Sequence, residues 1–270
     1  MRRLPTLYLL WLTLLSESFS ATLHVDGTST NPTSPYVTWG TAATAIHEAV
    51  SASFSGDTVL VAQGYYAITS NIQIPHALTL EGVSGAISTV IDGQNLAGSC
   101  VYATSTNLVL RGFTVTRGKF HGISAGNGGA TLIDSCIVVS NGFNSGSQGA
   151  GIQLGGLSTA RHCVVAFNTS TEDGGGVFLS DSTMLESCLI YGNEARRGGG
   201  IFANALTRIL NCTIWGNQAL HGGGILLSGF SSLVANCIAV SNQAAYGSNL
   251  VSLDENTAFN LCTSPANGWL

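Results

Sequence analysis

Residues 211–226 read NCTIWGNQALHGGGIL, and this stretch contains every element of a repeat that extends through much of the chain. Cys212 is followed five residues later by Asn217, and then by three glycines and an aliphatic residue. The same pairing of Cys with Asn occurs six times, at Cys136/Asn141, Cys163/Asn168, Cys188/Asn193, Cys212/Asn217, Cys237/Asn242 and Cys262/Asn267. Successive cysteines lie 27, 25, 24, 25 and 25 residues apart, which indicates a stacked repeat.

The apolar residues of each repeat alternate in short bursts, as in Cys212-x-Ile214 and Ile225-x-Leu227. A period of two over a few residues is typical of strands, and no repeat keeps the 3.6-residue period of a helix. Three short strands would make one turn of a flattened coil, and successive turns would stack at about 4.8 Å. The sequence therefore predicts an all-β solenoid, a parallel β-helix, over residues 101–270. An α-solenoid is disfavoured because Gly-rich and β-branched segments form poor helices.

Stacking turns each repeated residue into a vertical column. We expect the six Asn residues to form a ladder of amide hydrogen bonds, and the glycines to supply the positive φ of a tight corner. Residues three before each cysteine are apolar, whereas those directly before it are polar or small. This pattern predicts a short bend followed by a cysteine that points into the core. The predicted core column comprises Cys136, Cys163, Cys188, Cys212, Cys237 and Cys262.

The chain has seven cysteines, a number that suggests disulfides in an exported protein. In-register parallel neighbours, however, hold their Cβ atoms further apart than the roughly 3.8 Å that a disulfide prefers. A column of reduced, small apolar side chains is the preferred interpretation, and one or more strained bridges is the alternative. No metal site is expected, because no His shares the column and no CxxC pair occurs.

Residues 1–20 have the features of a secretory signal peptide. Arg2 and Arg3 precede the apolar run Leu4–Leu15, and the small residue Ser20 precedes Ala21. We expect cleavage there, a secreted or cell-surface protein and no transmembrane helix in the mature chain; an uncleaved anchor is the alternative. Removing residues 1–20 leaves 7 Lys and Arg against 13 Asp and Glu, a net charge of −6. Nucleic acid is therefore not an expected partner.

Residues 21–100 differ from the repeats and are expected to form an N-terminal cap and the first coils. An amphipathic α-helix is predicted from Ala42 to Ser53, with Thr41 as its N-cap. Its apolar stripe would consist of Ile46, Ala49, Val50 and Phe54. Such a helix can cover the open end of a solenoid.

The segments that follow this helix carry a family resemblance. GDTVLVAQGYY (56–66), ALTLEG (77–82) and TVIDG (89–93) resemble the N-terminal region of bacterial pectin-lyase-like β-helix proteins. The unit at 211–226 is similar to their right-handed β-helix repeats and to the Gly-rich repeats of chlamydial polymorphic outer membrane proteins. The resemblance implies a right-handed parallel β-helix. It does not imply one activity, because this coil carries lyases, hydrolases and adhesins.

A copy of the repeat before Cys136 lacks both anchor residues. Gly112 is expected at the Cys position and Arg117 at the Asn position. Arg117 would then form a basic cluster with Arg111 and Lys119, either as solvated surface or as an anion-contacting patch.

The residue before each glycine cluster is the main candidate for a ligand site. Asp173, Arg197, His221 and Tyr246 occupy this place in successive repeats, and Glu172 and Arg196 precede two of them. One interpretation is a ladder of ion pairs, Asp173 with Arg197 and Glu172 with Arg196. The other is a groove that contacts sugar hydroxyls or uronate carboxylates, with Arg as a carboxylate ligand and Tyr as a stacking surface.

A catalytic set cannot be assigned. The family resemblance implies clustered carboxylates with Ca²⁺ for a lyase or converging aspartates for a hydrolase, whereas the acidic residues of this chain are scattered. The leading hypothesis is a secreted β-helix protein that binds a polysaccharide or cell-surface glycan without catalysis and without a cofactor. The alternatives are a polysaccharide lyase, in which Ca²⁺ is a possible cofactor, and a structural or adhesive surface repeat.

The C-terminus falls within a repeat, because Leu270 comes three residues after Asn267. We therefore expect the chain to be truncated relative to a longer protein. Open strand edges at this end would permit end-to-end self-association.

Overall fold

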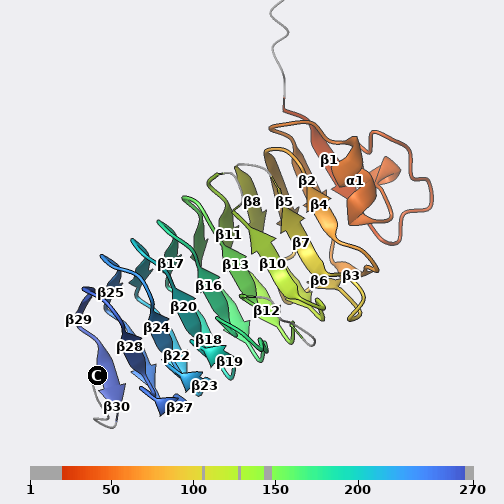
Figure 1. Cartoon of the computed structure of the whole chain (residues 1–270). Helices are drawn as coiled ribbons and strands as arrows, with labels where there is room; N and C mark the ends of the chain where they lie inside the picture. Colours follow the sequence, from red (N-terminus) through yellow and green to blue (C-terminus); the bar gives the residue numbers. More distant parts are fainter. Residues whose placement is uncertain (1–19, 105–106, 127–128, 143–147, 265–270) are drawn as a thin grey trace, which may run out of the picture.

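The computed structural model describes residues 20–104, 107–126, 129–142 and 148–264. The chain winds into a right-handed, all-parallel β-solenoid of about eight turns (Figure 1). This fold confirms the solenoid predicted from the repeat. Within the described ranges, no helix is both long enough and apolar enough to span a bilayer.

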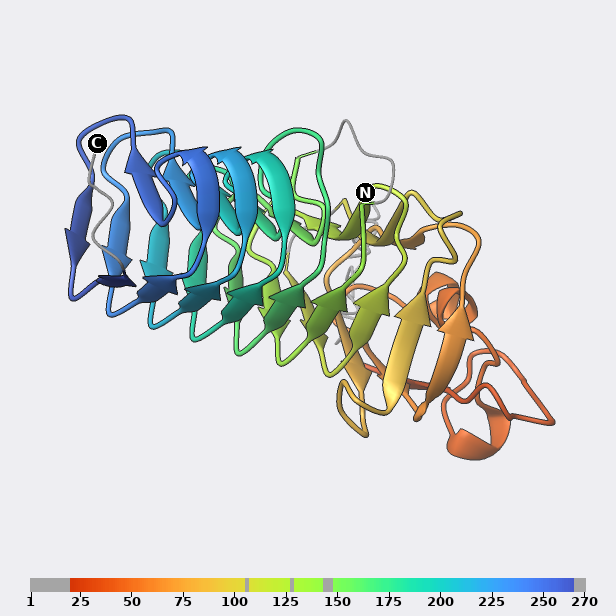
Figure 2. The same cartoon turned by 90° about the horizontal axis from the view of Figure 1, so that it is seen from below.

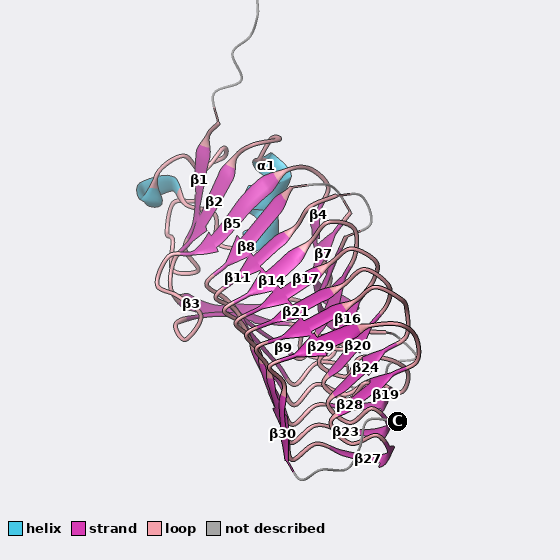
Figure 3. Cartoon of the chain, turned by 90° about the vertical axis from the view of Figure 1, so that its left-hand side faces the viewer, coloured by secondary structure: helices cyan, strands magenta, loops and turns pink. Residues whose placement is uncertain are grey.

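Three long sheets run along the solenoid, and a short fourth sheet lies at one of its edges (Figures 2 and 3). The ten-stranded sheet contains β1 (Thr22–Val25), β2 (Thr58–Val61), β5 (Leu78–Gly82), β8 (Leu108–Arg111), β11 (Leu132–Asp134), β14 (Thr159–Arg161), β17 (Met184–Glu186), β21 (Arg208–Leu210), β25 (Leu233–Ala235) and β29 (Thr257–Phe259). The eight-stranded sheet contains β4 (Ile72–Ile74), β7 (Ser99–Ala103), β10 (His121–Ala125), β13 (Ile152–Leu154), β16 (Val177–Leu179), β20 (Ile201–Ala203), β24 (Ile225–Leu227) and β28 (Leu250–Ser252). The nine-stranded sheet contains β3 (Gly64–Ala67), β6 (Thr89–Asp92), β9 (Thr114–Thr116), β12 (Ile137–Val139), β15 (Val164–Ala166), β18 (Leu189–Tyr191), β22 (Thr213–Trp215), β26 (Ile238–Val240) and β30 (Cys262–Ser264). The three-stranded sheet contains β19 (Glu194–Arg197), β23 (Gln218–His221) and β27 (Gln243–Tyr246).

The core consists of columns of identical positions. The residues three before the first five repeat cysteines pair in register and are fully buried, as predicted; they are Ile133, Ala160, Leu185, Ile209 and Val234. The predicted bend follows them, because Ser135, His162, Ser187, Asn211 and Asn236 all have φ between 52° and 56°. Short polar residues tolerate this left-handed conformation better than β-branched ones.

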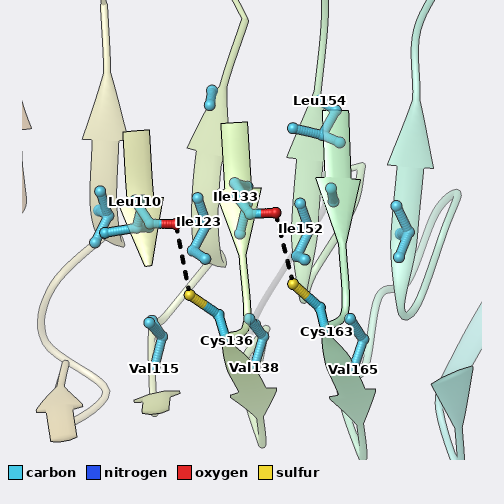
Figure 4. Packing of buried hydrophobic residues seen from close by; sticks show 14 of the residues in the cluster. Leu110, Val115, Ile123, Ile133, Cys136, Val138, Ile152, Leu154, Cys163 and Val165 are labelled. Atoms are coloured by element: carbon cyan, nitrogen blue, oxygen red, sulfur yellow. Dashed lines mark hydrogen bonds between the residues drawn. The ribbon is translucent and has the colours of Figure 1, made fainter. Parts of the chain in front are cut away.

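The bend turns the next residue, cysteine, into the core. Cys136, Cys163, Cys188, Cys212 and Cys237 are buried and carry free thiols. Figure 4 shows the thiols of Cys136 and Cys163 pointing toward the backbone carbonyls of Leu110 and Ile133 on the preceding turn. Each thiol therefore fills the space of a small apolar side chain and also donates weakly to a carbonyl.

The placement of Cys262 in this column is wrong. Cys262 is exposed and pairs with Ile238, the residue after Cys237. Leu261 takes the place opposite Cys237 and packs against the core instead. The cause is a shorter turn: β29 pairs Thr257 with Leu233, a step of 24 residues, whereas the cysteines are 25 apart.

The Asn side chains form a continuous buried ladder. In each of the first four steps, Nδ2 of one Asn donates to Oδ1 of the next over 2.9–3.0 Å, and the same Oδ1 accepts the backbone N–H of the preceding Asn. The described members are Asn141, Asn168, Asn193, Asn217 and Asn242. The ladder ends on Asn249, whose Oδ1 accepts from Nδ2 of Asn242 over 3.1 Å. Asn267 lies outside the described residues.

The copy before Cys136 is displaced by one residue from the predicted alignment. Gly112, with φ of 75°, forms the bend, and the fully buried Phe113 takes the cysteine position. Gly118 takes the Asn position, since its N–H donates to Oδ1 of Asn141 over 2.8 Å. Two members of the predicted basic cluster already have carboxylate partners. Arg111 pairs with Glu81 and Arg117 pairs with the buried Asp92, which argues against the anion-contacting alternative.

The N-terminal helix is shorter than predicted: α1 spans Ile46–Ala52 rather than 42–53. Thr41 lies in the 3₁₀ turn η1 (Trp39–Thr41), and the helix begins after Ala45, whose N–H donates to the Glu48 carboxylate over 3.1 Å. α1 contacts β1, β2 and β4 through three buried residues of the predicted stripe, Ile46, Ala49 and Val50. Phe54 does not belong to the stripe, because it follows the helix and is 77% exposed. The capping role of α1 stays a prediction.

Candidate functional site

The four candidate residues before the glycine clusters are vertical neighbours. Arg197 pairs in register with His221, and His221 pairs with Tyr246, at the ends of β19, β23 and β27. Asp173, which lies on the turn before Arg197, forms an isolated bridge with it. We call these four residues the edge column. The glycine that follows each of them has φ between 61° and 66°, which turns the chain from the three-stranded sheet into the eight-stranded sheet.

Asp173 and Arg197 form a two-pronged ion pair. Nε of Arg197 donates to Oδ1 of Asp173 over 2.7 Å, and Nη2 donates to Oδ2 over 2.6 Å. Asp173 is only 2% exposed, and Gln148 Nε2 also donates to its Oδ2 over 3.3 Å. Hydrogen bonding to Asp173 raises the pKa of the Arg197 guanidinium. The pair is therefore a fixed, neutralised unit at one end of the edge column.

Glu172 and Arg196 form the second predicted ion pair, but they face solvent. Nη2 of Arg196 donates to Oε2 of Glu172 over 2.7 Å, and both side chains are exposed. Neither residue lines the groove that borders the edge column. The structure thus separates the six candidate residues into the edge column, of which only Asp173 is buried, and a solvent-facing pair.

His221 and Tyr246 form the other half of the edge column. Their rings stack with centroids 4.9 Å apart and planes 13° from parallel. Tyr246 is 57% exposed, so the ring that lies outermost in the stack presents much of its surface to solvent. The pair provides an aromatic surface with imidazole and phenol groups at its rim.

An apolar row lies beside the edge column. Phe178, Phe202, Leu226 and Val251 are the middle residues of β16, β20, β24 and β28, and they pair in register. The Phe178 and Phe202 rings stack 5.4 Å apart, and the guanidinium of Arg197 lies 5.0 Å from the Phe202 centroid. Phe178, Phe202 and Leu226 are nearly fully buried, forming a second hydrophobic cluster outside the main core. We call these four residues the outer apolar row.

The outer apolar row could have been found in the sequence from runs of three apolar residues, which a search for period-two alternation does not detect. Strands VFL (177–179), IFA (201–203) and ILL (225–227) have three apolar residues in succession, where a strand with one solvated face would alternate. The middle residue must therefore be covered on the outside of the coil as well. Arg197 of the edge column provides part of that cover, because its guanidinium lies over the Phe202 ring.

The edge column and the outer apolar row enclose a groove of about 520 Å³ near the C-terminal turns. Its lining consists of Arg197, His221, Leu226, Tyr246, Val251, Ser252 and Leu253. Arg197, His221 and Tyr246 supply polar groups at successive turns along one wall, and apolar side chains supply most of the rest. Such a combination suits a ligand with apolar faces and hydroxyl edges.

The described ranges contain no group of three His, Cys, Asp or Glu side chains placed to hold one metal ion. Ca²⁺ binding was expected only for the lyase alternative, and it stays a prediction tied to that alternative.

Comparison with known proteins identifies the family. The sequence matches the family described as "Right handed beta helix region" over residues 98–264, more than half of the chain. The chain belongs to this right-handed β-helix family. A search of curated proteins finds no match to the sequence of this β-helix protein.

Solved structures share the fold of this β-helix protein at low sequence identity. Pectate lyase Pel9A is 11% identical, with a TM-score of 0.57, over 88% of this chain and 71% of the lyase. Pectin methylesterase PemA from Erwinia chrysanthemi is 10% identical, with a TM-score of 0.53, over 93% of this chain and 91% of the esterase. Alginate lyase from Paenibacillus sp. is 12% identical, with a TM-score of 0.52, over 82% and 93%. These similarities establish the pectin-lyase-like fold.

Proposed function

We propose that this β-helix protein is exported and that its groove binds an extended polysaccharide. The observation that carries the proposal is the exposed Tyr246 ring, stacked on His221 above an apolar floor that includes Leu226 and Val251. Sugar rings have apolar C–H faces that pack on aromatic side chains, and their hydroxyls hydrogen-bond to groups at the rim. The groove offers both kinds of contact.

The direction of the groove supports an extended ligand. Arg197, His221 and Tyr246 belong to three successive turns, so their backbones are about 4.8 Å apart along the solenoid axis. A linear chain that lay along this axis would meet one polar side chain per turn. A compact ligand would engage only part of the column.

The charge state of the groove favours uncharged sugars over uronates. Two guanidinium nitrogens of Arg197, Nε and Nη2, donate to Asp173, so its bidentate face is already occupied by a carboxylate. A uronate carboxylate would have to compete with Asp173 and would add charge beside an acidic protein. This corrects the expectation that Arg197 stands ready to receive a uronate.

The structural neighbours give independent support for a polysaccharide. Pectate lyase, pectin methylesterase and alginate lyase are named for polysaccharides, and they share the fold of this chain. A signal peptide over residues 1–20 would bring the protein to a secreted or cell-surface location, where such ligands occur.

The proposal is tested by affinity electrophoresis in gels that contain a neutral galactan or polygalacturonate. Retardation by the neutral glycan is expected. Tyr246→Ala should weaken it about tenfold, which corresponds to the loss of about 1.4 kcal/mol from one aromatic contact. Trp215→Ala is the matched control, because Trp215 is also about half exposed but lies on the nine-stranded sheet. Unretarded migration of the intact protein with every glycan tested would refute the proposal.

A lyase is the second candidate, and one observation favours it. Arg197 and His221 lie side by side in the groove, so an imidazole base is adjacent to the Asp173–Arg197 ion pair there. Incubation with pectate and alginate, with and without Ca²⁺, should then produce the ultraviolet absorbance of an unsaturated product, and His221→Ala should abolish it. If the absorbance does not rise in any mixture, the lyase candidate is rejected and polysaccharide binding remains the proposed function.

A further inference from the structure

The buried carboxylates of the described residues differ in whether a cation pairs with them. Asp57, Asp92 and Asp173 are all nearly inaccessible to solvent. Asp92 is paired with Arg117 and Asp173 with Arg197. Asp57, which is 4% exposed, forms no ion pair with any Lys, Arg or His of the described ranges. Buried carboxylates are normally compensated by a cation, so the surroundings of Asp57 require an explanation.

Asp57 accepts hydrogen bonds from two backbone nitrogens, and the shorter one comes from Ala21. This N–H donates to Oδ1 of Asp57 over 2.7 Å, while Oδ2 accepts the N–H of Phe54 over 2.8 Å. Ala21 directly precedes β1, and its carbonyl accepts the N–H of Thr58 over 2.9 Å. Asp57 thus holds the residue at which the first strand of the solenoid begins.

Ala21 is also the residue at which the signal-peptide pattern predicts the mature chain to start. We infer that cleavage between Ser20 and Ala21 completes a buried ion pair between the new α-amino group and Asp57, which locks β1 onto the solenoid. Hydrolysis of the Ser20–Ala21 peptide bond consumes one water, leaves the carboxylate on Ser20 and leaves the amine on Ala21. That amine takes up a proton at neutral pH and becomes the missing cation.

Neither Ala21 nor Asp57 has to move for this ion pair to form. The nitrogen that becomes the ammonium already lies 2.7 Å from the carboxylate oxygen, a normal distance for a charge-assisted hydrogen bond. Cleavage one residue earlier would place the ammonium on Ser20, about 3.8 Å further along the chain, and Ser20 is exposed. The cleavage position is therefore matched to Asp57 within one residue.

The first test uses the full chain expressed in a secreting bacterium. Mass spectrometry of the secreted protein should find Ala21 at its N-terminus. Any other N-terminal residue would overturn the inference.

The second test measures the reactivity of the new amine. The chain has a single lysine, Lys119, so a mature chain carries only two amines and Lys119 serves as an internal reference. The ion pair raises the pKa of the α-amino group and lowers its unprotonated fraction. Acylation of Ala21 at pH 7.5, relative to Lys119, should be about tenfold slower in the native protein than in Asp57→Asn. Equal relative rates would contradict the ion pair.

The third test remains decisive if Asp57→Asn does not fold. Two chains with native Asp57, one starting at Ala21 and one at Ser20, are compared by urea unfolding. The chain that starts at Ala21 should unfold at a clearly higher urea concentration, and adding N-acetylation to it should remove the difference. Identical midpoints for the two chains would refute the inference.

Discussion

Arg196 and Arg197 are neighbours in the sequence, yet they sit in opposite surroundings. Arg196 pairs with the exposed Glu172, whereas Arg197 pairs with the buried Asp173 and lies over the Phe202 ring. The difference arises because successive residues of β19 point to opposite sides of the strand. Only the second arginine is therefore joined to the groove and to the outer apolar row.

This contrast predicts unequal effects of the same substitution. Arg197→Met leaves the Asp173 carboxylate buried without a cation, which should lower the free energy of unfolding by about 2–3 kcal/mol. Arg196→Met breaks an exposed pair and should cost less than about 1 kcal/mol. Urea unfolding followed by circular dichroism measures both. Equal losses in the two variants would show that the burial of Asp173 has no energetic consequence.

The Asn ladder gives a second prediction. Nδ2 of Asn193 donates to the carbonyl of Val165 and to Oδ1 of Asn217, and its own Oδ1 accepts from Asn168. Asn193→Ala leaves several of these buried groups without partners and should cost at least about 3 kcal/mol. Asn31→Ala is the control, because Asn31 is exposed and its φ is not in the left-handed region, so this change should alter stability by less than about 0.5 kcal/mol. A small loss in Asn193→Ala would mean that water replaces the ladder.

The solenoid could be predicted because stacking turns sequence spacing directly into spatial register. Once Cys212 and Asn217 were matched with their copies, the bend, the buried column and the Asn ladder followed from period-two alternation. The edge column followed from the same alignment, since Arg197, His221 and Tyr246 all precede a glycine cluster.

The errors arose where spacing and register disagree. Cys262 keeps the 25-residue step, but its turn pairs at 24, so Leu261 replaces it in the core. A cysteine is small enough to be tolerated on either side of a strand, so residue type alone could not reveal the slip. The outer apolar row was missed for another reason: Phe202 and Leu226 are the middle residues of their strands and face outward from the coil, where Arg197 of the edge column lies over the Phe202 ring.

The register of Cys262 leads to a third prediction. Contact with the Cys163 thiol and then burial raise the pKa of Cys136, and burial raises the pKa of Cys100 to about 12. Both effects suppress the reactive thiolate at Cys136 and Cys100. Hydrogen bonding with Cys212 lowers the pKa of Cys237 to about 7, but Cys237 is only 1% exposed, so reagent cannot reach it in the folded protein, whereas Cys262 is exposed. A chromogenic disulfide reagent at pH 8 should therefore modify Cys262 quickly and the buried thiols only on unfolding. Cys262→Ser should remove the fast phase; a fast phase that persists in this variant would place another thiol at the surface.

The fourth prediction concerns acid. Hydrogen bonds from Arg161, and to a lesser extent from His162 and Ser135, lower the pKa of Asp134 to about 2. The folded value lies below the unfolded value of about 4, so Asp134 stabilises the fold fully above pH 4 and loses this contribution as the pH falls toward 2. Asp134→Asn should therefore lower the urea midpoint at pH 6, and its difference from the unsubstituted protein should shrink between pH 4 and pH 2. Asp181→Asn supplies the control, because Asp181 is exposed and forms no ion pair with a cation of the described residues. If the difference in urea midpoint between Asp134→Asn and the unsubstituted protein stayed constant down to pH 2, the charge of the Asp134 carboxylate would not be the source of its stabilising effect.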